Sequence, residues 1–140
     1  MNRISLPLKQ FVRAMAFVTI GAWLTLSNAP AHGEEVKPLF SQKLPNAPGK
    51  TLTAVLVNYG PGEKSPKHRH AGSVFAFVVS GTIRSENSVT GPARDYKAGE
   101  AFFEPDGSVH LVSANASATE PATLLAIFIA DDGAQLTTME

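Results

Sequence analysis

Two histidines separated by one residue, His68 and His70, are the side chains of this sequence best suited to chemistry. Successive side chains on a β-strand point to opposite faces, so imidazoles with this spacing on a strand would point the same way. Neutral imidazole is the commonest protein ligand for transition metals, and two on one face make half of a metal site. A third histidine, His110, lies in a separate loop-then-strand segment, so we expect folding to bring it to the other two.

Other polar side chains near these segments are candidates for supporting roles. Glu104 stands directly before Pro105, near the start of the strand expected to carry His110. It is a candidate metal ligand or catalytic base, and an exposed surface carboxylate is the competing interpretation. Tyr59 and Tyr96 are candidate pocket hydroxyls, although half-buried strand tyrosines are common. The competing interpretation of the histidines is that they are ordinary polar side chains.

The N-terminal region predicts export. Arg3, Lys9 and Arg13 precede an apolar run at residues 14–26, and Ala29-Pro30-Ala31 has the small-x-small pattern of a cleavage site. This order is typical of a secretory signal peptide at residues 1–31, and therefore of a secreted or periplasmic protein. The apolar run is shorter than the roughly 18 residues of a membrane span, although a retained anchoring helix is an alternative. We expect no membrane association after cleavage.

The composition narrows the remaining possibilities. The chain has no cysteine, which excludes a disulfide scaffold and a zinc site made of thiolates. Residues 32–140 hold nine Lys and Arg against twelve Asp and Glu, without the clustered basic surface of a nucleic-acid-binding protein. We divide this part into an N-terminal linker or arm at 32–50, one domain at 51–130 and a C-terminal tail at 131–140. The tail is expected to be polar, and a last short strand within it is an alternative.

The pattern of the domain is that of an all-β protein. Segments rich in apolar and β-branched residues, separated by Gly and Pro turns, predict strands at 51–59, 73–79, 82–86, 101–103, 109–113 and 122–129. Residues 87–93 are expected to be a polar loop, and the arm to hold at most a short strand at 39–43. The apolar run 124–129 fits a buried helix on pattern alone, but its β-branched neighbours favour a central strand. Short strands in this number indicate a sandwich or barrel.

Two motifs in this region resemble those of the cupin superfamily. Gly62, His68-x-His70 and Gly81 are similar to the first cupin motif, and Gly99, Pro105-x-Gly107 and His110 are similar to the second. The resemblance covers most of the chain after the leader and is closest to small, single-domain, exported cupin-2 proteins. It implies a jelly-roll β-barrel with a metal ion inside and with the motif glycines at barrel corners. It also makes a homodimer an expectation.

The chain departs from the first cupin motif at one place. The motif usually supplies a glutamate ligand, and Val74 stands at that position here. The resemblance then implies a site of three histidines, His68, His70 and His110, as in the thiol dioxygenases and diketone-cleaving dioxygenases among the cupins. The metal would be Fe, Mn, Ni or Zn.

Three functions remain open from the sequence. The first is a metal-dependent enzyme acting on a small organic molecule, with dioxygenase-like oxidoreduction favoured and hydrolysis or isomerisation as alternatives. The second is a non-catalytic module that uses the same barrel to bind or sense a metal or small molecule. The third, ranked last, is a structural or interaction protein in which the histidines have no role.

Overall fold

The computed structural model describes residues 33–140, and the predicted signal peptide at residues 1–31 lies outside them. The described chain is all-β, as the sequence predicts, and none of it forms a helix that could span a membrane. Its strands are β1 (Glu35–Lys43), β2 (Lys50–Tyr59), β3 (Lys64–Ser65), β4 (His68–His70), β5 (Ser73–Ser80), β6 (Thr82–Asn87), β7 (Gly91–Lys97), β8 (Ala101–Glu104), β9 (Val109–Asn115), β10 (Ala122–Asp131) and β11 (Thr137–Met139).

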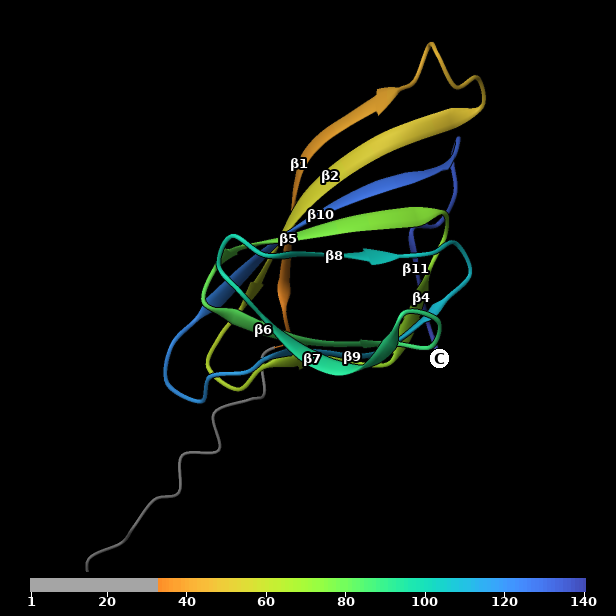
Figure 1. The fold of residues 1–140 in the computed structure, drawn as a ribbon. Coiled ribbons are helices and arrows are strands. Elements are labelled where there is room, and N and C mark those ends of the chain that lie inside the picture. The colour runs from red at the N-terminus through yellow and green to blue at the C-terminus, as the bar shows by residue number, and fades with distance from the viewer. Residues whose placement is uncertain (1–32) are drawn as a thin grey trace, which may run out of the picture.

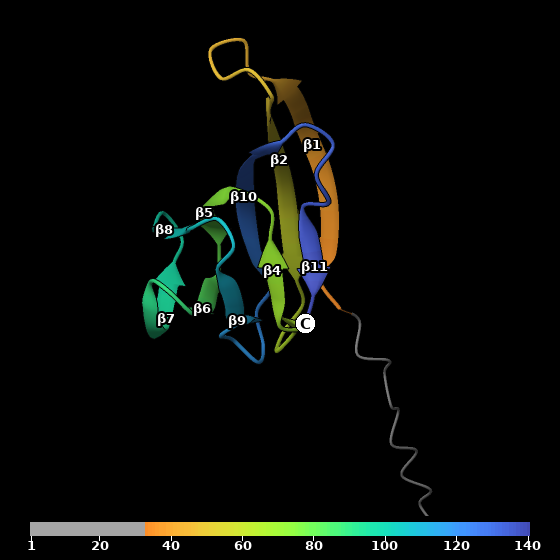
Figure 2. The ribbon, with the colours of Figure 1, turned by 90° about the vertical axis from the view of Figure 1, so that its right-hand side faces the viewer.

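The strands form two sheets that face each other (Figures 1 and 2). The first has the order β1-β2-β10-β5-β8 and the second the order β11-β4-β9-β6-β7, with β3 also paired to β9. All the strand pairs are antiparallel. Each sheet therefore mixes strands from both halves of the chain, and the space between the sheets can receive side chains from distant segments.

The apolar run 124–129 lies in the central strand β10 and is not a helix. It pairs with β2 on one side and β5 on the other, and its side chains alternate between buried and less buried along the whole strand. Leu124, Ala126 and Phe128 point into the space between the sheets. On the outer face of the run, Leu125 and Ile127 are half-buried and Ile129 is exposed.

The arm at 32–50 contains a longer strand than the sequence predicts. β1 begins at Glu35 and pairs with β2 over its full length, with an irregularity in register between Pro38 and Phe40. Proline lacks the N–H needed inside a sheet but is tolerated on an edge strand or at a bulge. β1 is such an edge strand and every residue in it is exposed. A polar, proline-containing segment therefore forms a strand through its pairing with β2.

One further boundary differs from the expectation, and one open alternative is decided. The predicted loop at 87–93 is shorter, because β6 continues to Asn87 and β7 begins at Gly91, the two residues being cross-strand partners. The Asn87 side chain accepts a hydrogen bond from the backbone N–H of Val89, which stabilises the tight turn. At the C-terminus, the predicted tail includes β11, which pairs with β4.

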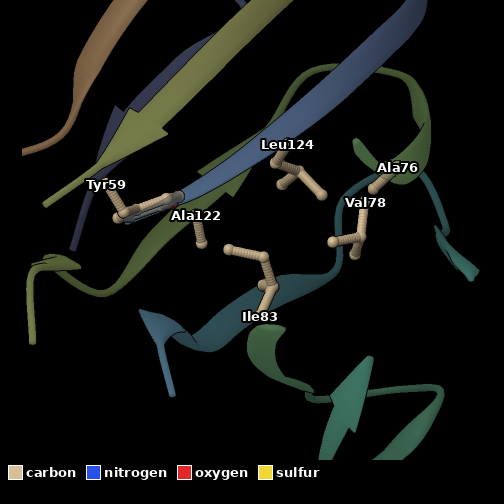
Figure 3. Packing of buried hydrophobic residues seen from close by; sticks show 6 residues of the cluster. All are labelled: Tyr59, Ala76, Val78, Ile83, Ala122 and Leu124. Carbon is tan, nitrogen blue, oxygen red and sulfur yellow. The ribbon is translucent and has the colours of Figure 1, made fainter. Parts of the chain in front are cut away.

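Buried apolar side chains from both sheets fill one end of the molecule. Tyr59, Ala76, Val78, Ile83, Ala122 and Leu124 form this cluster (Figure 3). The chain reverses direction beside it at Gly81, whose φ of 73° brings the backbone against Pro121 and Ala122. The other three motif glycines, Gly62, Gly99 and Gly107, also have positive φ, as expected of corner residues.

Candidate metal centre

The three histidines meet inside the barrel, as the sequence predicts. β4 pairs with β9 so that His68 is the direct cross-strand partner of His110, and His70 is the next residue of β4 on the same face. The ring centroid of His68 lies 4.6 Å from that of His70 and 5.0 Å from that of His110. One ring nitrogen from each histidine lies within 4.8 Å of the other two, so the group could hold a metal ion.

Backbone carbonyls determine the tautomers of the two histidines on β4. Nδ1 of His68 lies 2.6 Å from the carbonyl oxygen of Pro66, and Nδ1 of His70 lies 3.1 Å from that of Leu136. A carbonyl oxygen only accepts hydrogen bonds, so each Nδ1 carries the proton and each Nε2 of the neutral rings has a free lone pair. These two Nε2 atoms face each other at 3.1 Å. Two lone pairs at this distance repel, and a cation between or beside them relieves the repulsion.

His110 presents a second unsatisfied nitrogen. Its ring is almost completely buried, with 2% of the residue exposed, and its Nε2 lies 2.8 Å from Oγ of Ser85. Its Nδ1 is buried without a hydrogen-bond partner among the described residues. A buried polar atom with no partner costs stability, and a metal-ligating nitrogen is one of the few states that explains it.

Burial favours the neutral form of His70 and His110. Burial, followed by the charge of His68, lowers the pKa of His70 to about 4. Burial, followed by the charges of His68 and His70, lowers the pKa of His110 to about 3. Only neutral imidazole can bind a metal, so the donor set fits a divalent ion such as Zn, Fe, Mn or Ni.

Glu104 lies beside this group and is buried, so the interpretation of an exposed carboxylate is wrong. Only 3% of the residue is exposed, and its Oε2 lies 3.2 Å from Nδ1 of His110 without the geometry of a hydrogen bond. Nδ2 of Asn87 donates a long hydrogen bond of 3.4 Å to the same oxygen. Burial raises the pKa of Glu104 to about 7, against a smaller lowering effect from Asn87.

Glu104 lies opposite the position at which cupins usually have a glutamate. Its cross-strand partner is Val74, the residue that stands at that position here. Both side chains line the same cavity, so the chain supplies a carboxylate from β8 beside the place where β5 lacks one. Glu104 is not a member of the three-histidine group, and its role as ligand or base stays a prediction.

Several residues that orient the histidines were not predicted from the sequence. They are Pro66 beside β4, Ser85 on β6, and Leu136 and Thr137 in the region expected to be a tail. Pro66 and Leu136 act through their backbone carbonyls, and because every residue type has one, the sequence gives no signal for this role. Ser85 is on the inner face of a predicted strand, and that alternation was the only available signal.

The histidines open onto a cavity of about 190 Å³. Its wall is mostly apolar, with Val55, Val57, Val74, Leu124, Ala126 and Phe128. Tyr59 lies in the wall with its hydroxyl hydrogen-bonded, as expected of a pocket tyrosine, whereas Tyr96 packs against Phe102 and is not part of the lining. A mostly apolar cavity with a few convergent polar groups is typical of small-molecule sites.

A family model for the cupin domain, Cupin_2, matches residues 55–128. The chain belongs to the Cupin_2 family. The two sheets of this cupin and the position of its histidines between them agree with that membership. No curated protein matches the chain.

Solved structures share this cupin's fold. A double-stranded β-helix domain protein from Klebsiella pneumoniae is 18% identical with a TM-score of 0.59, covering 89% of this chain and 96% of its own. A Cupin 2 conserved barrel domain protein from Salinispora arenicola is 21% identical with a TM-score of 0.55, covering 86% and 92%. The DMSP lyase DddQ from Ruegeria pomeroyi DSS-3 is 20% identical with a TM-score of 0.60, covering 76% of this chain. This cupin spans only 51% of the lyase chain.

Proposed function

We propose that this cupin is a metal-dependent enzyme that converts a small organic molecule in its barrel cavity. His68, His70 and His110 would hold the metal. The observation that carries the proposal is the pair of Nε2 lone pairs facing each other at 3.1 Å, with both Nδ1 protons committed to backbone carbonyls. Two neutral rings in that arrangement repel each other unless a proton or a metal ion lies at the pair. The Nδ1 of His110, which has no hydrogen-bond partner among the described residues, favours a metal ion.

The surrounding residues have defined tasks in such an enzyme. A bound metal supplies Lewis acidity and coordination positions that three protein ligands leave open for substrate or water. The carbonyls of Pro66 and Leu136 hold two of the rings in the orientation that a ligand needs. The apolar cavity wall excludes water from the substrate. Glu104, which lines the same cavity, is the residue placed to accept or donate a proton.

Dioxygenase-like oxidoreduction is the first candidate reaction. The reason is the neutral set of three imidazoles, which leaves the metal its full charge and matches the three-histidine dioxygenases that the sequence resembles. A lyase reaction, in which a base removes a proton and a leaving group departs, is the second candidate. The buried carboxylate of Glu104 favours it, and two structures with a similar fold are named as DMSP lyases.

The decisive experiment is elemental analysis of the natively exported protein beside three variants. We expect close to one equivalent of a divalent metal in the wild type and less than about a tenth of that in His68→Ala and His110→Ala, because each removes a ligand. His32→Ala, which changes the fourth histidine of the sequence, is the matched control and should keep its metal. A wild type that contains no metal and binds none on titration contradicts the proposal.

Turnover separates the enzyme from a non-catalytic binding module. The metal-loaded protein is assayed for oxygen uptake with diketones, thiols and phenols, and for loss of DMSP under anaerobic conditions. Substrate-dependent oxygen uptake supports the dioxygenase, and anaerobic loss of substrate supports the lyase. Tight metal binding with no turnover across the panel favours the module instead. Export to the periplasm and a homodimer stay predictions, to be checked by fractionation and light scattering.

A further inference from the structure

A cluster of three hydroxyl groups lines the cavity and has no part in the metal centre. The hydroxyl of Tyr59 lies 2.8 Å from Oγ of Ser65 and 2.8 Å from Oγ of Ser113. The three residues come from β2, β3 and β9, and Ser65 and Ser113 are direct cross-strand partners. Tyr59 and Ser113 are only 3% and 4% exposed, so these are built-in, desolvated groups.

The cluster has more hydrogen-bonding capacity than it uses. Three hydroxyls carry three hydrogens, and the two contacts among them use two. Within the described residues, none of the three oxygens has another hydrogen-bond partner, so one hydrogen and several lone pairs are left over. Burial raises the pKa of Tyr59, which keeps its hydroxyl protonated across the neutral range. A buried group with spare donors and acceptors beside a cavity is prepared to bind a polar atom of a ligand.

The charges around the cavity indicate what kind of ligand atom the hydroxyls would bind. No Lys or Arg from the described residues lines the cavity, and Glu34 is a carboxylate. At the hydroxyl end, away from the histidines, a carboxylate or phosphate would therefore find no cationic side chain as a partner. Hydroxyls both donate and accept, which suits a neutral oxygen.

The dimensions limit the size of the ligand. A volume of about 190 Å³ is below the roughly 300–1,000 Å³ of pockets for drug-sized molecules. Ser113 lies three residues beyond His110 on β9, at most about 10 Å along the strand. A molecule with a few carbon atoms therefore spans the distance from the histidines to the hydroxyls, with its apolar part against Val57 and Leu124.

We propose that Tyr59, Ser65 and Ser113 form a substrate-binding subsite for a neutral oxygen function, such as an alcohol, ketone or ether. The substrate is then a small, largely apolar molecule with this oxygen at one end and its reacting group at the histidines. The subsite determines which molecules bind and in which direction they lie. The placement of the reacting group at the histidines rests on the proposed metal-dependent function. The binding of the oxygen at the three hydroxyls does not.

Two matched fluorinated probes test the subsite. 4-Fluorobenzyl alcohol carries a neutral hydroxyl, and 4-fluorotoluene has nearly the same shape without it. Dissociation constants are measured by ¹⁹F NMR titration on the metal-loaded protein and again after chelation. We expect the alcohol to bind about fivefold or more tightly than the toluene in both states, as one or two hydrogen bonds predict.

Variants assign that preference to the cluster. Tyr59→Phe and Ser113→Ala should each reduce the preference to less than about twofold while 4-fluorotoluene binds as in the wild type. Ser41→Ala on the exposed strand β1, which removes a hydroxyl contact to Thr53 of β2, is the matched control and should keep the preference. If Tyr59→Phe does not fold, Ser65→Ala and Ser113→Ala decide the result.

Several outcomes would overturn the subsite. They are equal binding of the two probes, no binding of either up to its solubility limit, a preference that survives all the variants, and tighter binding of 4-fluorobenzylammonium than of the alcohol. A preference for the alcohol that appears only in the metal-loaded protein and is unchanged in the variants would mean that the oxygen binds the metal. This result also overturns the subsite. A preference that follows the variants in a protein unable to bind metal supports the subsite while the metal-dependent function fails.

Discussion

At the scale of single residues, the site is defined by hydrogen-bonding states more than by residue types. His68 and His70 each give their Nδ1 proton to a carbonyl, and His110 retains a nitrogen with no partner. Glu104 adds a buried carboxylate whose folded-state pKa of about 7 exceeds its ordinary value of 4.5. The sequence predicts all four of these residues, but it contains no information on their protonation.

The raised pKa of Glu104 predicts a pH-dependent stability. The folded protein holds this proton up to about pH 7, whereas the unfolded chain releases it near pH 4.5, so the contribution of Glu104 to stability falls as the pH rises between these values. Glu104→Gln cannot ionise. In the presence of a chelator, its free energy of unfolding should match the wild type near pH 4.5 and exceed it by about 3 kcal/mol at pH 8. Urea unfolding at both pH values measures this.

A difference between the two proteins that is the same at both pH values would contradict the prediction. It would show that the carboxylate is solvated or paired in the folded state. Asp95→Asn, which changes an exposed carboxylate paired with Arg84, is the control and should show no comparable pH dependence.

At the scale of elements, the short C-terminal strand β11 completes the site. It pairs with β4, and the residue just before it, Leu136, provides the carbonyl that orients His70, while Thr137 and Met139 line the cavity. The family model ends at residue 128, before this strand begins. The region expected to be a tail is therefore part of the candidate metal centre.

Removing β11 should weaken metal binding. A chain that stops at Gln135 loses the Leu136 carbonyl, and we expect a metal affinity that is about 10- to 100-fold lower, the usual effect of losing a group that orients a ligand. Isothermal titration with Zn²⁺ measures it, and circular dichroism checks that the barrel is folded. Glu140→Gln weakens only the exposed ion pairs with Arg69 and Lys67 and should bind as the wild type does. Equal affinity in the truncated chain would show that β11 has no part in orienting His70.

The elements also show what a sequence can predict and what it cannot. Strands with strong apolar patterns, such as β2, β5 and β10, were predicted to within a residue or two because local burial determines them. β1 was mostly missed, since its exposed, proline-containing residues form a strand only through pairing with β2. The carbonyl of Leu136 could not be predicted, because a backbone atom 66 residues from its histidine acquires a role only in the folded chain.

At the scale of the whole molecule, the three histidines bring together segments that are far apart in the chain. The second sheet contains β4 and β9 from the two motifs and β11 from the C-terminus. A metal bound by His68, His70 and His110 would bind only the folded barrel. Such a ligand stabilises the fold by an amount that depends on its concentration relative to its dissociation constant.

Metal should therefore raise the melting temperature of the whole domain in one step. With free Zn²⁺ at 100 times its dissociation constant, the stabilisation is about 2.7 kcal/mol, which corresponds to roughly 10 °C or more for a domain of this size. Differential scanning fluorimetry of the chelated protein with added Zn²⁺ measures the shift. His110→Ala should show none, and His32→Ala should shift as the wild type does. An equal shift in His110→Ala would place the binding site elsewhere.

Strand β9 contains one extra residue between His110 and Ser113, and this residue determines which side chains of the strand face inward. The register with β6 passes from Val112 directly to His110, so Leu111 is an extra residue in the strand. Because of it, His110 and Ser113 both face inward although they are three positions apart, an odd spacing that would put them on opposite faces of a regular strand. Deletion of Leu111 would leave His110 and Ser113 two positions apart, so a regular strand without the extra residue would still point both side chains inward. Insertion of one residue after Leu111 without a second bulge would instead turn either His110 or Ser113 outward, and the histidines and the hydroxyls would then no longer share one cavity.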